Sequence, residues 1–149
     1  MMDTIVVPVT HHNRWNRQVA NVAAELEDVS DTYALVVYRF ADDLDSTIKH
    51  LDVDREEADI DEMAARKSGV TEVVETLDER GMSYAIRGTE AAESKGEELL
   101  ELVEDEGADR IYMYSRKRSP AGKAIFGSGL QNVLFNSSVP VIVVPPNLE

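Results

Sequence analysis

The residues best suited to chemistry lie in one segment near the C-terminus, residues 114–129. It reads Tyr-Ser-Arg-Lys-Arg-Ser-Pro-Ala-Gly-Lys-Ala-Ile-Phe-Gly-Ser-Gly, and its four bases are Arg116, Lys117, Arg118 and Lys123. Such bases can neutralise the charge of a phosphate. The segment ends at Gly127-Ser128-Gly129, where we expect a helix to begin with Ser128 as its N-cap, and a helix start offers free N–H groups to an anion. The pattern predicts an anion-receptive loop, although these three residues could form only a turn and a cap.

The charge distribution makes the same segment stand out. The chain has a formal net charge of -14, yet residues 111–148 contain no Asp or Glu. Buried strand and helix explain the missing acids, because such segments carry few charges. Burial does not explain four bases within eight positions, so the basic cluster favours a functional role.

Two common phosphate motifs do not fit. The P-loop pattern G-x4-G-K-[ST] matches Gly122-Lys123, but Lys117 replaces its first glycine and Ala124 replaces its hydroxyl residue. The pattern G-x-G-x-x-G starts at Gly127 and Gly129 but ends on Asn132. A P-loop triphosphatase and a dinucleotide-binding Rossmann site are therefore disfavoured.

Regular alternation of strands and helices must position this loop. β-Branched runs bounded by turn residues predict buried strands, and apolar residues at helical spacing predict helices. The predicted strands are 4–9, 33–40, 83–87, 109–114 and 139–144, and the predicted helices are 14–28, 62–80, 94–106 and 129–136. We expect residues 41–59, which are acidic, to form a loop or an exposed helix. This order predicts a parallel sheet with helices on both faces and ligands beyond the carboxyl ends of the strands.

Composition limits the class of protein. A chain of 149 residues with 43% hydrophobic residues suits one domain, residues 1–149. No apolar run approaches the roughly 18 residues of a membrane span, no signal peptide is visible, and there is no cysteine, so we expect a cytoplasmic protein. The acidity disfavours binding to nucleic acid or to an anionic membrane. It favours adaptation to a salt-rich cytoplasm, with an ordinary acidic bacterial protein as the alternative.

The whole chain resembles the universal stress protein family. The resemblance rests on the opening strand Ile5–Val9, on Gly107–Met113, on Gly127–Leu134 and on the closing Val139–Val144. It implies a Rossmann-like three-layer α/β/α sandwich whose five-stranded parallel sheet has the order 3-2-1-4-5. The order would bring Thr10 close to Tyr114 and Ser115. The resemblance also implies a homodimer formed through the last strand, Val139–Val144.

Many members of that family bind ATP through G-x2-G-x9-G-[ST], and this chain retains only part of that motif. Tyr114 and Lys117 stand at the two earlier glycines, and Thr10 stands at the acid after the first strand. Phosphate, another anion or a differently posed adenine nucleotide would still fit. The cofactor-binding residues that the resemblance implies are Pro8, Val9, Thr10, Val37, Tyr114, Ser115, Arg116, Lys117, Arg118, Gly127, Ser128 and Gly129.

We expect a non-enzymatic, homodimeric stress protein that responds to a nucleotide or an anion. One alternative is a member that has lost ATP binding and acts as a protein-interaction module. Another is a slow ATPase or self-phosphorylating protein, although no general base is evident beside Ser115, Ser119 or Ser128. His11 and His12 follow the first strand near the expected ligand crevice, but adjacent histidines without an acid are poor chelators, so we expect no metal site.

Overall fold

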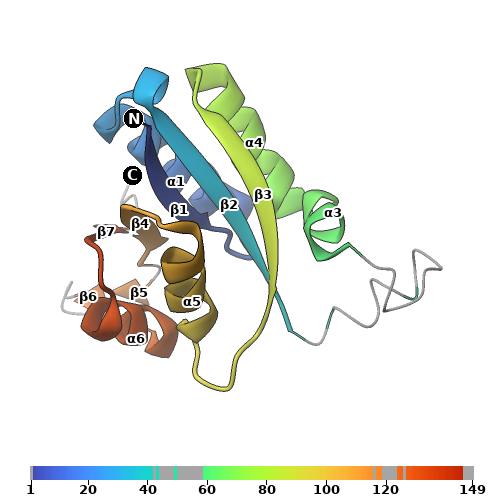
Figure 1. Cartoon of the computed structure of the whole chain (residues 1–149), viewed down its shortest axis with the longest axis vertical. Coiled ribbons are helices and arrows are strands. Elements are labelled where there is room, and N and C mark those ends of the chain that lie inside the picture. Colours follow the sequence, from blue (N-terminus) through green and yellow to red (C-terminus); the bar gives the residue numbers. More distant parts are fainter. Residues whose placement is uncertain are drawn as a thin grey trace.

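The chain forms a five-stranded parallel sheet with helices on both faces (Figure 1). The structure is a computed structural model that describes residues 2–41, 43, 49, 59–115, 117–118, 124–125 and 127–145. The elements are β1 (Asp3–Pro8), α1 (Asn13–Leu26), a 3-10 turn (Val29–Asp31), β2 (Thr32–Phe40), α3 (Ile60–Ala65), α4 (Ser68–Arg80), β3 (Ser83–Glu90), α5 (Glu97–Glu106), β4 (Arg110–Tyr114), β5 (Lys117–Arg118), β6 (Ala124–Ile125), α6 (Ser128–Asn136) and β7 (Val141–Val144).

The strand order is β3-β2-β1-β4-β7, and every neighbouring pair in this sheet is parallel. Because β7 is the fifth strand of the sheet along the chain, the predicted order 3-2-1-4-5 is confirmed. The order reverses between β1 and β4, and β3 and β7 form the two edges. The expected ligand position, beyond the carboxyl ends of β1 and β4, follows from this reversal.

Alternate strand residues build two separate cores, which makes the fold a three-layer α/β/α sandwich. Ile5 and Val7 pack in the core under α1 and α4, whereas Val6 packs with Leu99 of α5 and Val133 of α6. Figure 1 shows α1 and α4 together behind the sheet and α5 and α6 in front of it. All three strand residues are fully buried, which explains why β1 reads as a continuous apolar run instead of an alternating one.

The single helix predicted over 62–80 is wrong, because the chain breaks between α3 and α4. Lys67 has an extended backbone (ψ 138°) and stands just before α4. Asp61 of α3 accepts a hydrogen bond of 2.7 Å from the backbone N–H of Gly88, and a Cβ at Gly88 would lie 2.5 Å from the Ile60 carbonyl oxygen. The break lets α3 pack against β3 while α4 packs along α1, which one straight helix could not do.

Most other boundaries agree with the predictions to within two or three residues. β3 is longer than expected because it pairs with β2 through Glu90, α5 begins at Glu97, and β7 begins at Val141. The segment predicted as a loop contains a short antiparallel pair, β5 with β6. Most of the acidic stretch 41–59 lies outside the described residues. Among the residues that are described, no helix is both long and apolar enough to cross a membrane.

A polar network lies at the amino-terminal ends of β1 and β4, at the end of the sheet opposite the expected ligand position. The carboxylate of Glu27, just after α1, accepts hydrogen bonds from Arg110 Nε (2.9 Å), Arg110 Nη2 (2.5 Å) and the Tyr112 hydroxyl (2.5 Å). Burial alone would raise the pKa of Glu27, but these donors outweigh burial and lower that pKa below its usual value. Arg110 also pairs with Asp3. The network fixes α1 against the start of β4.

Candidate functional site

A cavity of about 360 Å³ lies beyond the carboxyl ends of the central strands. The ladder between β1 and β4 contains only Ile5 opposite Arg110 and Val6 opposite Ile111, although both strands continue beyond these pairs. β1 remains paired with β2 as far as Pro8, so the opening forms on the β4 side. The cavity lies in the size range of small-molecule sites, roughly 300–1,000 Å³.

Seven of the predicted site residues line this cavity together, although they come from three distant parts of the chain. Val9 and Thr10 follow β1, Tyr114 and Ser115 end or follow β4, and the last three begin α6: Gly127, Ser128 and Gly129. The expected proximity of Thr10 to Tyr114 and Ser115 is thus present in the structure. Whether these residues bind a ligand stays a prediction.

Other predicted positions are not brought into the cavity lining. Pro8 and Val37 pair with each other in the β1–β2 ladder and are absent from the described lining residues. Lys117 and Arg118 form β5, and only their backbone is described. Arg116 lies outside the described residues, as do Lys123, Ser119 and His50.

Ser115 places a buried hydroxyl group at the cavity. It is only 3% exposed, its backbone N–H donates to the Val144 carbonyl at 2.9 Å, and its hydroxyl has no hydrogen-bond partner among the described residues. A buried hydroxyl without a partner costs about 1–3 kcal/mol, so such groups are rare in folded chains. A ligand oxygen in the cavity would supply the missing partner.

The start of α6 faces the same cavity with its backbone donors uncapped. Gly127, with an extended backbone (φ -68°, ψ 164°), is the N-cap, and Ser128 is the first helical residue. The prediction that Ser128 would be the N-cap is therefore wrong by one residue. Among the described residues, no side chain caps this helix. Since the first N–H groups of a helix have no partner within it, they are available to an anion.

The turn before α5 holds the start of α6 in place. Asn132 Nδ2 donates to the Lys95 carbonyl at 2.9 Å. Gly96 adopts a left-handed conformation (φ +91°), and a Cβ there would lie 2.7 Å from the Gly129 carbonyl oxygen. Glycine is required here because it adopts the left-handed conformation without strain and has no Cβ to collide with Gly129. The turn and the start of α6 therefore pack backbone against backbone.

Thr10 is held by Asn16 and is not the charged group that the family pattern places there. Asn16, 1% exposed, accepts hydrogen bonds from the Thr10 N–H (2.7 Å) and hydroxyl (2.9 Å), and its Nδ2 donates to the Thr10 carbonyl at 3.1 Å. The Thr10 hydroxyl also accepts from the His12 N–H at 3.1 Å. This arrangement fixes the loop after β1 and adds no negative charge to the cavity.

Tyr114, which replaces a motif glycine, forms one wall of the cavity. Its ring stacks on Trp15 with centroids 5.0 Å apart and an interplanar angle of 21°, and Trp15 in turn contacts His12. Burial raises the pKa of the Tyr114 hydroxyl, with an opposing effect from Arg14. Because Trp15 is the only tryptophan in the chain, its fluorescence offers a reporter for events in the cavity.

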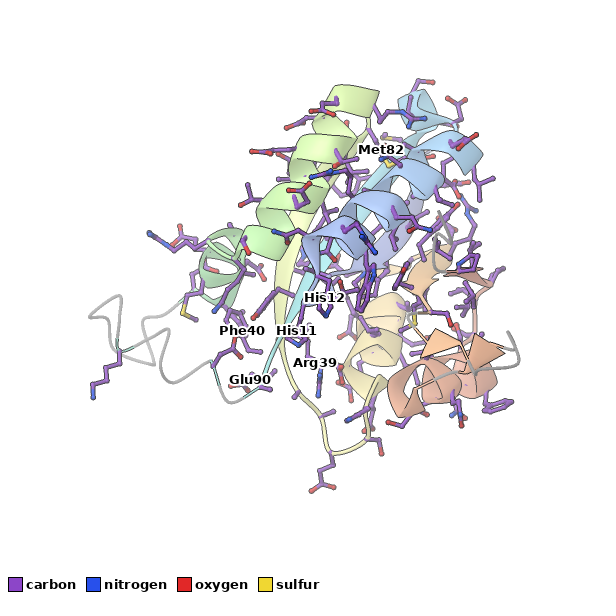
Figure 2. The ribbon with its side chains drawn as sticks, turned by 180° about the vertical axis from the view of Figure 1, so that it is seen from behind. His11, His12, Arg39, Phe40, Met82 and Glu90 are labelled. Carbon is purple, nitrogen blue, oxygen red and sulfur yellow. The ribbon has the colours of Figure 1, made fainter. Side chains whose placement is uncertain are left out.

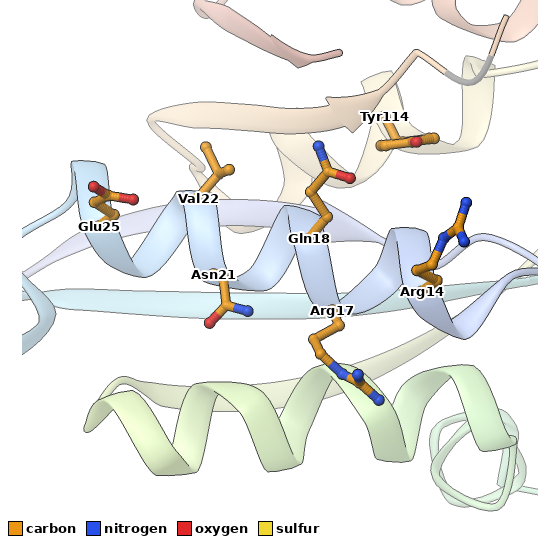
Figure 3. A pocket seen from close by; sticks show the side chains of 7 residues that line it. All are labelled: Arg14, Arg17, Gln18, Asn21, Val22, Glu25 and Tyr114. Carbon is orange, nitrogen blue, oxygen red and sulfur yellow. The ribbon is translucent and has the colours of Figure 1, made fainter. Parts of the chain in front are cut away.

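A second hollow of similar volume lies beside α1 and shares Tyr114 with the cavity. Figure 3 shows Gln18, Val22 and Tyr114 on its sheet side and Arg17 turned toward α4. Gln18 Nε2 already donates to the Pro145 carbonyl at 2.7 Å, and Arg17 pairs with Glu72. Since two of its polar lining residues already have partners, this hollow is the weaker candidate.

The sequence analysis did not assign five other lining residues to the site: His11, Arg39, Lys95, Met113 and Leu130. His11 was noted near the crevice without a role. Figure 2 shows His11 and Arg39 near the carboxyl ends of β1 and β2. The available signal for Arg39 was a lone charge at the end of a buried strand. In the described part of the chain, no three His, Cys, Asp or Glu residues are grouped to hold a metal ion.

Comparisons with known proteins agree with this architecture. A universal stress protein from Mycolicibacterium smegmatis is 31% identical over 91 residues, covering 61% of this chain and 69% of that protein. Among solved structures, a universal stress protein from Archaeoglobus fulgidus matches with a TM-score of 0.69 and 22% identity, covering 96% of this chain and 98% of that one. A universal stress protein from the same organism, solved in complex with dAMP, matches with a TM-score of 0.65 and 16% identity, covering 96% and 97%.

The model of the universal stress protein family matches residues 1–145, which is nearly the whole chain. The two solved structures support the fold, since both share less than a quarter of their residues with this chain. The family match and the strand order together show that the chain belongs to the universal stress protein family.

Proposed function

We propose that this chain is a non-enzymatic stress or regulatory protein that binds an adenine nucleotide, or a simpler phosphate-bearing anion, in the cavity between β1 and β4. The observation that carries the proposal is the buried hydroxyl of Ser115, which has no partner among the described residues, in a cavity that the start of α6 also faces. Both groups donate to oxyanions. A phosphate here would accept from the Ser115 hydroxyl and from the first N–H groups of α6.

The dAMP complex of the Archaeoglobus protein supports the nucleotide as ligand, because that structure shares this fold. Because motif positions are altered in this chain, we expect the nucleotide to bind in a pose that differs from the one in other family members. Tyr114 fills space that glycine would leave open and is anchored on Trp15, whereas Thr10 leaves the cavity without the acid of the family pattern. A nucleoside monophosphate therefore suits the cavity better than the extended triphosphate of other members.

Ser115→Ala gives a test that separates binding from folding. The variant removes a hydroxyl that has no partner in the described part of the chain, so its melting temperature should equal or exceed that of the unchanged protein. Its affinity for AMP should fall by roughly tenfold or more, because a hydrogen bond to a charged group contributes about 1.5–3 kcal/mol. Ser83→Ala, at the exposed start of β3 and the opposite end of the sheet, is the matched control.

The titration is followed by Trp15 fluorescence and by calorimetry, with AMP, ATP-magnesium and inorganic phosphate as ligands. Saturable AMP or phosphate binding that Ser115→Ala weakens and Ser83→Ala does not would support the proposal. A folded protein that binds none of the three would contradict it. That result would favour a protein-interaction module in which Tyr114 has closed the nucleotide site.

We also propose that the active form is a homodimer joined through β7. β7 is an edge strand, paired on one side with β4, and an exposed edge offers unpaired backbone groups to a second chain. Slow ATP hydrolysis or self-phosphorylation at Ser115, Ser119 or Ser128 is the remaining alternative. Intact mass after incubation with ATP and magnesium tests self-phosphorylation, since an added phosphoryl group would be detected directly.

A further inference from the structure

Two cations line the candidate cavity from elements outside the family's nucleotide motif. Arg39 lies near the end of β2, and Lys95 lies in the turn before α5. Among the described lining residues there is no Asp or Glu. In a chain with a formal net charge of -14, the described lining thus carries two cations, of which Arg39 is paired with a carboxylate buried beside it. A ligand with a single phosphate leaves part of this charge unused.

A buried carboxylate positions Arg39. Glu98, in the first turn of α5, is 6% exposed, and its Oε1 lies 3.1 Å from Arg39 Nε. The Arg39 side chain is 38% exposed, so it reaches from this buried anchor into the open cavity. The contact between Arg39 Nε and Glu98 Oε1 is not aligned as a hydrogen bond, because Arg39 Nε has no hydrogen-bond partner among the described residues. Glu98 Oε2 has no hydrogen-bond partner among them either. Glu98 therefore holds Arg39 by charge without using the guanidinium donors fully.

The two anion-attracting regions lie on opposite sides of β1. Ser115 and the start of α6 are on the β4 side, where Asn132 holds the backbone of Lys95 against that helix. Arg39 is on the β2 side. Neighbouring strands are about 4.8 Å apart, so the ends of β2 and β4 are separated by roughly 10 Å. Adjacent phosphates of a di- or triphosphate are much closer to each other than this.

We infer that Arg39 is a specificity-determining residue that recognises a second phosphate, separated from the first by the sugar, so that the preferred ligand is a nucleoside bisphosphate. The inference rests on the proposed function, because it places the first phosphate at Ser115 and α6. A ribose carries its two phosphates on different carbons and so separates them by more than a shared oxygen. A guanidinium matches a terminal phosphate through paired N–H donors. Neutral Thr10 adds no repulsion.

The test compares adenosine 3′,5′-bisphosphate with AMP in titrations followed by Trp15 fluorescence. The unchanged protein should bind the bisphosphate roughly tenfold or more tightly than AMP, as expected for one added charge-assisted contact. Arg39→Gln should reduce that ratio to about one, because the second phosphate then loses its guanidinium partner. The matched control is Arg87→Gln, which removes the same charge from a surface pair with Glu106 outside the described cavity lining.

Arg39→Gln leaves the buried Glu98 without its cation, which could unfold the protein. The double variant Arg39→Gln with Glu98→Gln removes both charges and should show the same loss of the ratio in a folded chain. A ratio near one in the unchanged protein, or a ratio that survives in the double variant, would overturn the inference. If AMP binds and depends on Ser115 but the ratio is one, only this inference fails. If neither ligand binds, the proposed function fails with it.

Discussion

Gly96→Ala tests whether the turn before α5 holds the cavity together. Gly96 has φ +91°, and a Cβ there would lie 2.7 Å from the Gly129 carbonyl oxygen and 2.9 Å from Val133 Cγ2. Gly81 gives a matched control, because it has a similar φ of +79° but no heavy atom within 4 Å of a Cβ. Both variants force alanine into the left-handed region, and only Gly96→Ala adds a collision.

The left-handed conformation costs a non-glycine residue about 1–2 kcal/mol, which applies to both variants. Overpacking against backbone atoms adds about 1–3 kcal/mol for Gly96→Ala alone. In a domain of this size, 1 kcal/mol corresponds to roughly 2–4 °C in melting temperature. We therefore expect Gly81→Ala to lower the melting temperature by roughly 2–8 °C and Gly96→Ala by roughly 4–20 °C.

The collision has a second consequence, because Gly129 lines the cavity and belongs to the first turn of α6. To relieve it, the start of α6 must move away from the turn, and the N–H groups proposed to bind phosphate move with it. Gly96→Ala should therefore weaken AMP binding at a temperature where the protein is still folded, whereas Gly81→Ala should not. Thermal melts followed by circular dichroism, with titrations at 15 °C below each midpoint, make the comparison. Equal melting temperatures and equal affinities in the two variants would refute the reasoning.

Three further predictions concern acid stability, salt and assembly. Because the pKa of Glu27 in the folded chain lies below its usual value, its stabilisation is present above about pH 4.5 and is lost as the pH falls through the lower folded value. Glu27→Gln should therefore lower the free energy of unfolding by about 1.5–3 kcal/mol at neutral pH. In urea unfolding, that free energy should then fall less steeply between about pH 5 and pH 3 than it does in the unchanged protein, and an equally steep fall would contradict this. If the acidity is an adaptation to salt, the melting temperature should rise from 0.01 to 1 M KCl, as the Debye length falls from about 30 to about 3 Å, and a salt-independent value would argue against it. In β7 the carbonyl of Val144 accepts a hydrogen bond from the Ser115 N–H, so the N–H of Val143 points to the free edge. Val143→Pro should therefore convert a dimer into a folded monomer, as measured by light scattering. Ile142→Pro should in addition break the pairing with β4. A Val143→Pro dimer would place the interface elsewhere.

The regular periodicity of the chain was enough to predict most of its strands and helices, whereas the order of the strands in the sheet came from the resemblance to the universal stress protein family. β1 and β2 read as continuous apolar runs because both of their faces are covered, and that pattern survives in a single sequence. Gly81 and Gly107 end α4 and α5 with positive φ values, as a helix stop followed by a strand requires. These features depend on neighbours along the chain, so local patterns specify them.

The cavity residues outside the motif could not be found in this way. Arg39 and Lys95 lie more than fifty residues apart, and only the order β2-β1-β4 and the packing of the turn on α6 bring them to one cavity. The break at Lys67 likewise arises because α3 packs against β3, whereas α4 packs along α1. Local propensity determined which segments fold as strands and helices. Tertiary packing decided which polar groups are buried without a partner among the described residues, above all the Ser115 hydroxyl, because burial depends on contacts between segments far apart in the sequence.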